Sequence, residues 1–142
     1  MSVKLETHWV VGFTDGHGCF HVAINRHPKM KIGYQVLPEF AIVLHKDDIQ
    51  MLHELKAFFG CGVVRPVQGD RLALRVRSRR HLMRRIIPFF AQHKLKTSKG
   101  IDFIRFRKVL HMMERREHLS PTGLETIRRI VEGPVRPERS EE

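Results

Sequence analysis

The sequence predicts an α+β fold with antiparallel strands, on three observations. Two β-hairpin patterns occur, over residues 18–44 and 62–77, and each is followed by a segment with helical periodicity. Both of these segments contain a Phe-Phe pair near their end, Phe58-Phe59 and Phe89-Phe90. Apolar residues that alternate along a short run are typical of half-buried strands, whereas spacings of three and four are typical of helices. The order strand, strand, helix, repeated once, therefore predicts an α+β arrangement in which the strands are antiparallel.

The first hairpin is predicted over residues 18–26 and 34–44. Apolar side chains alternate along both runs, so that one face of each strand is expected to be buried. A polar turn over residues 26–33 joins them. Pro38 lies inside the second run. Because proline has no N–H to donate to a neighbouring strand, that strand is expected to be at an edge of the sheet or bent at this residue.

Four helices are predicted further along the chain from apolar residues at spacings of three and four. The first begins after Asp47 or Asp48 and stops at Gly60. The second follows the hairpin of residues 62–67 and 71–77; Ser78 is its expected N-cap, and Pro88 is expected to end or kink it. After a linker at residues 93–98 come a long helix and a shorter one over residues 121–132.

Residues 8–25 form a β-hairpin if propensity alone is considered. The run from His8 to Thr14 is rich in β-branched and aromatic residues, and Asp15-Gly16 is a strong turn signal. A helix here would contain Gly12 and Gly16, each of which costs roughly 1 kcal/mol relative to alanine. Such a helix is reasonable only if the two glycines, which would share one helix face beside Trp9 and Phe13, serve close packing.

The charge of the chain indicates a polyanionic partner. Lysine and arginine total 26 against 15 acidic residues, which gives a net charge of +11 and an isoelectric point near 10.5. Nucleic acid is the commonest partner of such a protein. A generically solvated basic surface is the alternative that charge alone leaves open. An anionic membrane surface is disfavoured because the basic residues do not gather on one long amphipathic helix.

The length of 142 residues predicts one domain over residues 1–132, followed by a flexible tail over residues 133–142. The sequence has no apolar run long enough for a membrane span and no apolar signal core at its start, so neither a membrane partner nor secretion is expected. Cys19 and Cys61 lie far apart and outside any C-x-x-C pattern. They indicate a reducing compartment, namely the cytoplasm, a nucleoid or an organellar matrix.

The run Val10-Val-Gly-Phe-Thr-Asp-Gly-His-Gly18, with Cys19-Phe20 after it, resembles the motif of the single-motif LAGLIDADG homing endonucleases. Four further segments resemble landmarks of that family in the same order, at residues 33–40, 58–62, 87–90 and 94–97. The likeness thus extends over most of the chain. It implies an αββαββα fold, in which a helix over residues 7–17 replaces the hairpin expected from propensity.

The resemblance also implies a homodimer that binds double-stranded DNA. Two copies of the first helix would pack across a twofold axis, with Trp9, Gly12, Phe13 and Gly16 at the interface. The antiparallel strands of both copies would form a saddle over the major groove of a long pseudo-palindromic site. Eight residues are expected to contact this DNA: His21, Asn25, His27, Gln35, Arg65, Arg71, Arg75 and Arg77.

The implied activity is hydrolysis of phosphodiester bonds on both strands by an intron-encoded endonuclease that uses a divalent metal, Mg²⁺ in the family. Position 17 and the carbonyl of Gly16 would hold the metal, and Lys96 would stabilise charge at the scissile phosphate. The family has an acid where this chain has His17. Three interpretations of His17 remain: it binds a softer metal such as Mn²⁺, it acts as a general base, or the protein binds DNA without cutting it.

Neighbouring positions leave alternatives of their own. Asp15 is expected to serve local structure, and metal binding is its alternative role. Leu44 stands where the family commonly has a glutamine that touches metal-bound water; either it simply completes a buried face or His45 takes the glutamine's place. A zinc site built on Asp15, His17 and His21 is disfavoured because no cysteine or fourth ligand accompanies them.

Two other functions are compatible with parts of the sequence. One is a DNA- or RNA-binding protein of the same fold without catalysis, such as a maturase that binds intron RNA or a regulator. The other is a small basic RNA-binding or ribosome-associated protein of unrelated fold, which would make the whole resemblance accidental. Lys96 and the two motif glycines favour the enzyme, whereas His17 and Leu44 favour the non-catalytic binder.

Overall fold

A computed structural model describes residues 4–133 of the chain. Helix α1 (Thr7–His17) leads into a hairpin of β1 (Gly18–Arg26) and β2 (Tyr34–His45), which a single 3-10 turn (Lys46–Asp48) joins to α2 (Ile49–Phe59). A second hairpin of β3 (Val63–Pro66) and β4 (Arg71–Val76) follows. The rest is helical: α3 (Arg79–His81), a π turn (Leu82–Ile86), α4 (Ile87–Gln92), α5 (Lys99–Glu114), a 3-10 turn (Glu117–Leu119) and α6 (Pro121–Glu132).

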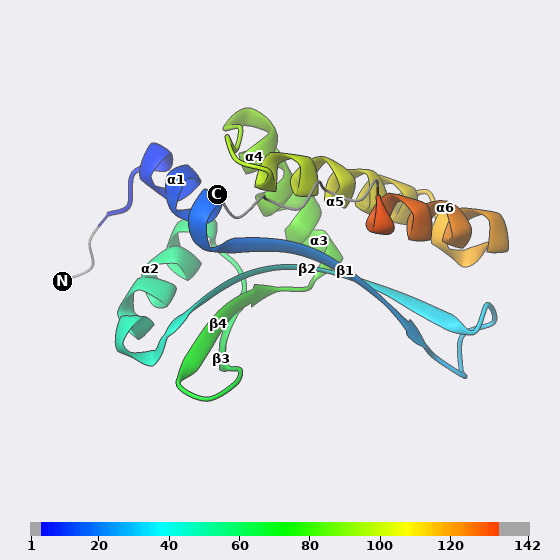
Figure 1. Cartoon of the computed structure of the whole chain (residues 1–142), viewed down its shortest axis with the longest axis horizontal. Coiled ribbons are helices and arrows are strands. Elements are labelled where there is room, and N and C mark those ends of the chain that lie inside the picture. Colours follow the sequence, from blue (N-terminus) through cyan, green and yellow to red (C-terminus); the bar gives the residue numbers. More distant parts are fainter. Residues whose placement is uncertain (1–3, 134–142) are drawn as a thin grey trace, which may run out of the picture.

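The four strands form one antiparallel sheet in the order β1-β2-β4-β3. Helices α1, α4, α5 and α6 lie along one side of this sheet, and α2 lies near one end of it (Figure 1). The predicted α+β class with antiparallel strands is therefore confirmed, as is the order αββαββα of its first elements. No helix within residues 4–133 has the length and apolar character needed to cross a bilayer.

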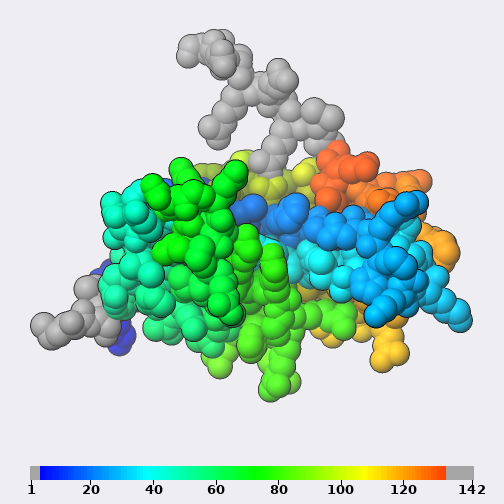
Figure 2. Space-filling view, turned by 90° about the horizontal axis from the view of Figure 1, so that it is seen from below, coloured from blue at the N-terminus to red at the C-terminus, as the bar shows by residue number. Residues whose placement is uncertain are grey.

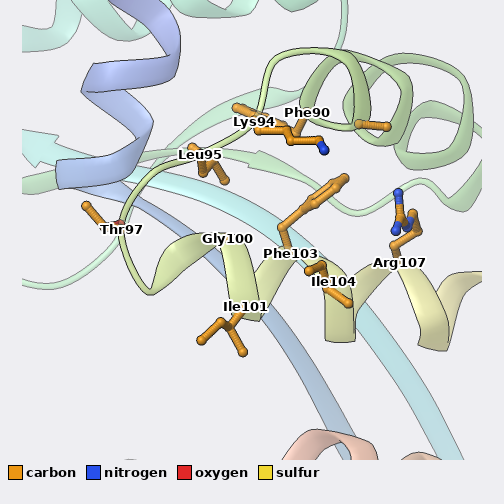
Figure 3. Close-up of a pocket in the computed structure, with 10 residues that line it drawn as sticks. Phe90, Lys94, Leu95, Thr97, Gly100, Ile101, Phe103, Ile104 and Arg107 are labelled. Atoms are coloured by element: carbon orange, nitrogen blue, oxygen red, sulfur yellow. The ribbon is translucent and has the colours of Figure 1, made fainter.

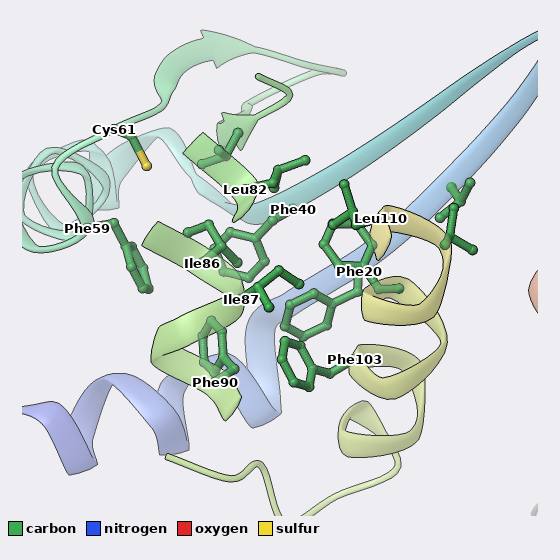
Figure 4. Packing of buried hydrophobic residues seen from close by; sticks show 14 of the residues in the cluster. Phe20, Phe40, Phe59, Cys61, Leu82, Ile86, Ile87, Phe90, Phe103 and Leu110 are labelled. Atoms are coloured by element: carbon green, nitrogen blue, oxygen red, sulfur yellow. The ribbon is translucent and has the colours of Figure 1, made fainter. Parts of the chain in front are cut away.

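Aromatic packing joins the sheet to the helices. The Phe20 ring of β1 lies 5.1 Å from Phe40 of β2 and 5.4 Å from Phe90 of α4, measured between centroids. Figure 4 shows these rings beside Phe59 and Phe103 in the same core. The two Phe-Phe pairs of the sequence also meet, since Phe58 and Phe89 make an edge contact at 5.4 Å. Aromatic pairs at such distances stabilise a core by more than their buried area alone.

The hairpin expected from propensity over residues 8–25 is wrong, and the helix over residues 7–17 is confirmed. Val10 and Thr14 are fully buried on its inner face, and the Thr14 hydroxyl donates a hydrogen bond of 2.8 Å to the Val10 carbonyl. Burying an aliphatic side chain stabilises by about 1.5–3 kcal/mol, which exceeds the cost of one helical glycine. Tertiary packing therefore overrides the local preference of this segment.

The structure refines two proline expectations. Strand β2 is central rather than an edge strand, but β4 pairs only with residues 40–45 of it, so Pro38 lies where one side of β2 has no neighbour. Pro88 does not end its helix, which continues to Gln92. A π turn precedes it instead, with the Ile87 N–H bonded to the Leu82 carbonyl. The predicted tail lies outside the described residues except for Gly133.

Candidate nucleic-acid interface

The face of the sheet that the helices leave uncovered carries side chains from odd-numbered positions of all four strands. Strand pairing places His21 opposite Glu39, Asn25 opposite Gln35, and Arg75 between Ala41 and Val63. Even-numbered residues of the same strands, such as Phe40 and Leu74, are fully buried on the other face. Figure 2 views the molecule from the uncovered side, where residues of both hairpins lie next to one another.

Seven of the eight residues expected to contact DNA are brought together on this face. They are His21 and Asn25 of β1, Gln35 of β2, Arg65 of β3, and Arg71, Arg75 and Arg77 on or just after β4. His27 is the exception, because it lies past the end of β1 in the turn, half-buried, with its N–H bonded to the Gly33 carbonyl at 2.9 Å. The face is long, strongly basic and free of covering helices, which suits a duplex.

Glu39 is a residue of this face that the sequence reasoning did not single out. Its Oε2 accepts a hydrogen bond of 2.8 Å from Nε of Arg77, and its Oε1 lies 3.3 Å from Nε of Arg75. The second contact is an ion pair without hydrogen-bond geometry, since the buried Arg75 Nε has no hydrogen-bond partner. Among the outward residues of the described strands Glu39 is the one acid. An acidic residue at an outward position of an otherwise basic alternating pattern is the sequence signal by which Glu39 could have been predicted.

Helix α1 presents an open, partly aromatic face. Trp9, 42% exposed, stacks on Phe13 at 4.7 Å, and the Phe13 ring lies 4.6 Å from that of His17 in a tilted arrangement. A Cβ atom added at Gly12 or Gly16 would meet no described atom within 4 Å. An exposed apolar surface of this kind is typical of an interaction site. The four residues expected at a dimer interface thus lie on one exposed helix.

The carboxylate of Asp15 ties the end of α1 to the loop that carries Lys96. Its oxygens accept hydrogen bonds from the N–H of Lys96 at 3.0 and 3.1 Å, and from the N–H and hydroxyl of Thr97 at 3.0 and 2.8 Å. Burial raises the pKa of Asp15, but these hydrogen bonds outweigh that effect, so its pKa lies below the ordinary value of 3.8. Both oxygens bind the loop, which favours a structural role over metal binding, although the partners are distant in sequence rather than local.

Lys96 borders a hollow of about 360 Å³ between α1 and this loop. His8, His93 and Lys94 line it together with Lys96 and Asp15, so most of its polar groups are basic. Lys96 itself is exposed. A second hollow of about 360 Å³ lies on the helix side, where Leu95, Ile101 and Ile104 surround it (Figure 3). Its lining is mainly apolar, with Lys94 and Arg107 as the charged residues.

The donor atoms near position 17 do not fit Mg²⁺. His17 supplies an exposed imidazole beside Phe13, and the nearest carboxylate, Asp15, is occupied by the loop. Leu44 is buried on the core face, and His45 is bonded through Nδ1 to the Asp47 N–H at 3.1 Å rather than turned towards α1. Residues 4–133 contain no group of three or more His, Cys, Asp or Glu able to hold a metal. Mg²⁺ prefers oxygen ligands and is held through carboxylates.

Comparison with known proteins gives matches along most of the chain. The family model described as LAGLIDADG endonuclease matches residues 10–110. "Probable intron-encoded endonuclease 2" of Neurospora crassa is 29% identical over 120 residues, which are 84% of this chain and 25% of that protein. "Probable intron-encoded endonuclease Cox1-I1b" of Schizosaccharomyces pombe is 30% identical over 109 residues, 76% of this chain and 28% of that protein. The chain therefore spans about a quarter of the length of these curated relatives.

Two solved structures are similar over about nine-tenths of the chain. The homing endonuclease I-TnaI is 54% identical, with a TM-score of 0.88 over 91% of this chain and 87% of that chain. The meganuclease I-SmaMI, bound to uncleaveable DNA, is 36% identical, with a TM-score of 0.88 over 90% of this chain and 44% of that chain. The chain thus corresponds to nearly all of one and to just under half of the other.

Proposed function

The chain belongs to the LAGLIDADG endonuclease family, and from that premise we propose that it is an intron-encoded homing endonuclease that recognises a long, pseudo-palindromic double-stranded DNA site. The observation that carries this proposal is the uncovered sheet face, where seven of the expected contact residues lie together. A twisted antiparallel sheet of this kind fits the major groove, where each base pair presents a distinct pattern of donors and acceptors.

The DNA-binding unit in this proposal is a homodimer formed through α1. Support comes from the open positions at Gly12 and Gly16 and from the exposed stack of Trp9 and Phe13. A twofold dimer matches a pseudo-palindromic site because each copy reads one half of it. Two copies would carry a formal charge of +22 (2 × 11), so binding should weaken steeply as salt rises.

Cleavage would take place at the end of α1. Asp15 holds the loop so that Lys96 lies beside this helix end, and its ammonium would stabilise negative charge on the scissile phosphate. Family members use a divalent metal to activate water and neutralise the phosphate. Because the donors of this chain do not suit Mg²⁺, an ion somewhat softer than Mg²⁺, such as Mn²⁺, is the better candidate for His17.

Binding without cutting is the second candidate, and His17 with Leu44 is the observation that favours it. Neither residue supplies an oxygen ligand where the family has an acid and commonly a glutamine. Loss of such groups removes most of the hold on a metal. The DNA-binding face does not depend on them, so recognition could persist without hydrolysis.

A cleavage assay separates the two candidates. A target is first enriched by the full chain from a library of randomised duplexes, and cutting is then measured with Mg²⁺ and with Mn²⁺ for the native chain and for His17→Asp. We expect the native chain to cut with Mn²⁺ and His17→Asp to cut with Mg²⁺ as well. Cutting by His17→Asp alone would overturn the active-enzyme proposal in favour of the second candidate. Failure of the native chain to enrich any duplex would overturn both.

A further inference from the structure

Glu39 holds an unusual place on the uncovered sheet face. It lies opposite His21 of β1, and the register of β2 with β4 puts it beside Arg75 and Arg77. A lone carboxylate on a surface that attracts phosphate weakens that attraction. Its presence therefore calls for a role other than general affinity.

The geometry shows which atoms of the arginines Glu39 occupies. Both contacts are made by Nε, at 3.3 Å from Arg75 and 2.8 Å from Arg77. The Glu39 side chain is only 18% exposed, whereas those of Arg75 and Arg77 are 33% and 64% exposed. The Glu39 side chain is thus less exposed than that of either arginine. A hydrogen bond restrains Arg77 at Nε, and an ion pair holds Arg75 at the same atom. The contacts leave the two terminal nitrogens of each guanidinium to serve a ligand.

An arginine restrained in this way suits a base better than a phosphate. Two terminal nitrogens form a planar fork that matches the O6 and N7 acceptors of guanine in the major groove. Fixing the fork before binding removes the entropy cost of ordering a long side chain and penalises bases that cannot accept both hydrogen bonds. A phosphate contact needs mainly positive charge, which the carboxylate would partly cancel.

Both arginines also border one hollow of about 390 Å³ at the end of the β3–β4 hairpin. Arg65 and His81 line the same hollow, with Gly62 and Val63 between them. A base edge that enters this space would lie against both Arg75 and Arg77. The hollow is therefore a space in which both arginines would contact a base edge.

We propose that Glu39 is a specificity-determining positioning residue, which fixes Arg75 and Arg77 so that they select guanine at two positions of each half-site. The proposal rests on the proposed DNA-binding function but not on whether the chain cuts. It assigns to Glu39 an effect on base choice at particular positions, rather than on overall affinity.

The test is enrichment of randomised duplexes by the full-length native chain, by Glu39→Gln, and by Glu125→Gln as a control with the same change of charge. Glu125 lies on α6, where it pairs with Arg129 at 3.7 Å and is remote in sequence from the strands. We expect Glu39→Gln to lose about five- to tenfold of the guanine preference at two positions per half-site, a fraction of what two bidentate contacts supply. The remaining positions should keep their preferences, and Glu125→Gln should match the native profile.

A third variant, Arg77→Lys, keeps the charge but loses the planar fork, so it should lose guanine preference at one of the same two positions. Circular dichroism shows whether Glu39→Gln is folded. If it is not, the Arg77→Lys variant tests the proposal in its place. Profiles of Glu39→Gln and Arg77→Lys that match the native chain, or that weaken equally at every position, would overturn the proposal while the proposed function stands. A native chain that selects no sequence would overturn both.

Discussion

At the scale of single residues, Asp15 shows how a motif residue can act through the backbone. Its carboxylate accepts hydrogen bonds from a loop 81 and 82 residues further along the chain. The sequence reasoning favoured a local structural role for Asp15 but could not identify its partners. Contacts so distant in sequence depend on how α1 packs beside the loop, and no local pattern encodes that.

Replacing Asp15 by asparagine should loosen this loop. An amide has one acceptor oxygen instead of two and carries no charge, so we expect the free energy of unfolding to fall by about 1–2 kcal/mol. Urea denaturation of the variant and of the native chain measures this difference in the free energy of unfolding. Asp70→Asn is the matched control, because its ion pair with Lys46 is exposed and its loss should change stability by at most about 0.5 kcal/mol. Equal effects of the two substitutions would contradict the role assigned to Asp15.

His118 provides a pH-dependent prediction at the same scale. Burial and the nearby Arg79 lower the pKa of His118 below its ordinary value of 6.5, and its buried Nδ1 has no hydrogen-bond partner among the described residues. A pKa that is lower in the folded state than in the unfolded state means that the unfolded chain binds more protons. The stability contribution is therefore complete above the unfolded pKa and is lost as the pH falls through the folded pKa.

His118→Gln should remove this part of the pH dependence. Between about pH 7 and pH 5 the native chain should lose more stability than the variant, as measured by chemical denaturation across that range. His53→Gln is a suitable control, because His53 is an exposed residue of α2. A slope with pH that is unchanged in His118→Gln would show that His118 is not protonated differently in the folded chain.

At the scale of elements, alternation and helical spacing in the sequence predicted the hairpins and most helices. Helix α1 was predicted only through the family resemblance, and the two proline segments needed the structure. The alternating runs succeed because each strand buries one face. Helix α1 forms against its local β propensity because the burial of Val10 and Thr14 stabilises the helix by more than its glycines destabilise it. Pro88 has no N–H to donate, and a π turn before it lets the helix continue. A sequence pattern does not distinguish this arrangement from the end of a helix.

The turn into α6 gives a prediction at this scale. Gly123 lies buried in the first turn of α6, where a Cβ atom would overlap the carbonyl oxygen of Glu117. Gly123→Ala should lower the midpoint of thermal unfolding and cost about 2 kcal/mol, because the clash is with backbone rather than with a movable side chain. Thr122→Ala, at the exposed preceding position, should cost much less. Equal stability of Gly123→Ala and the native chain would contradict the tight packing of this turn.

At the scale of the whole molecule, the sequence indicated which residues share the uncovered sheet face but not how they are paired. The residues expected to contact DNA were predicted from the family resemblance, and seven of them share the uncovered face. The contacts of Glu39 with Arg75 and Arg77 could not be predicted, because they require the register of β2 against β4, 38 residues away in the case of Arg77. His27 lies in the turn of the first hairpin rather than on this face, and its contact with DNA stays a prediction.

The proposed dimer makes Gly12 the most sensitive position on the surface. Gly12→Leu should leave the fold of one chain intact, because no described atom lies near the added Cβ, but it should separate the two helices of a close-packed pair. Sedimentation should then show a monomer or an aggregate. Gln50→Leu adds a leucine at an exposed position of α2 and should leave the dimer unchanged. A dimer that persists in Gly12→Leu would contradict packing through α1.

The central claim is that two copies of this chain act together on one DNA duplex. The most direct test is the mass of the complex, by analytical ultracentrifugation, on an enriched target and on a duplex that contains only one half of it. We expect two chains on the full target. Binding to the half target should be weaker by at least about a hundredfold, because the second copy finds no half-site. One chain per duplex, with equal affinity for both duplexes, would contradict the central claim.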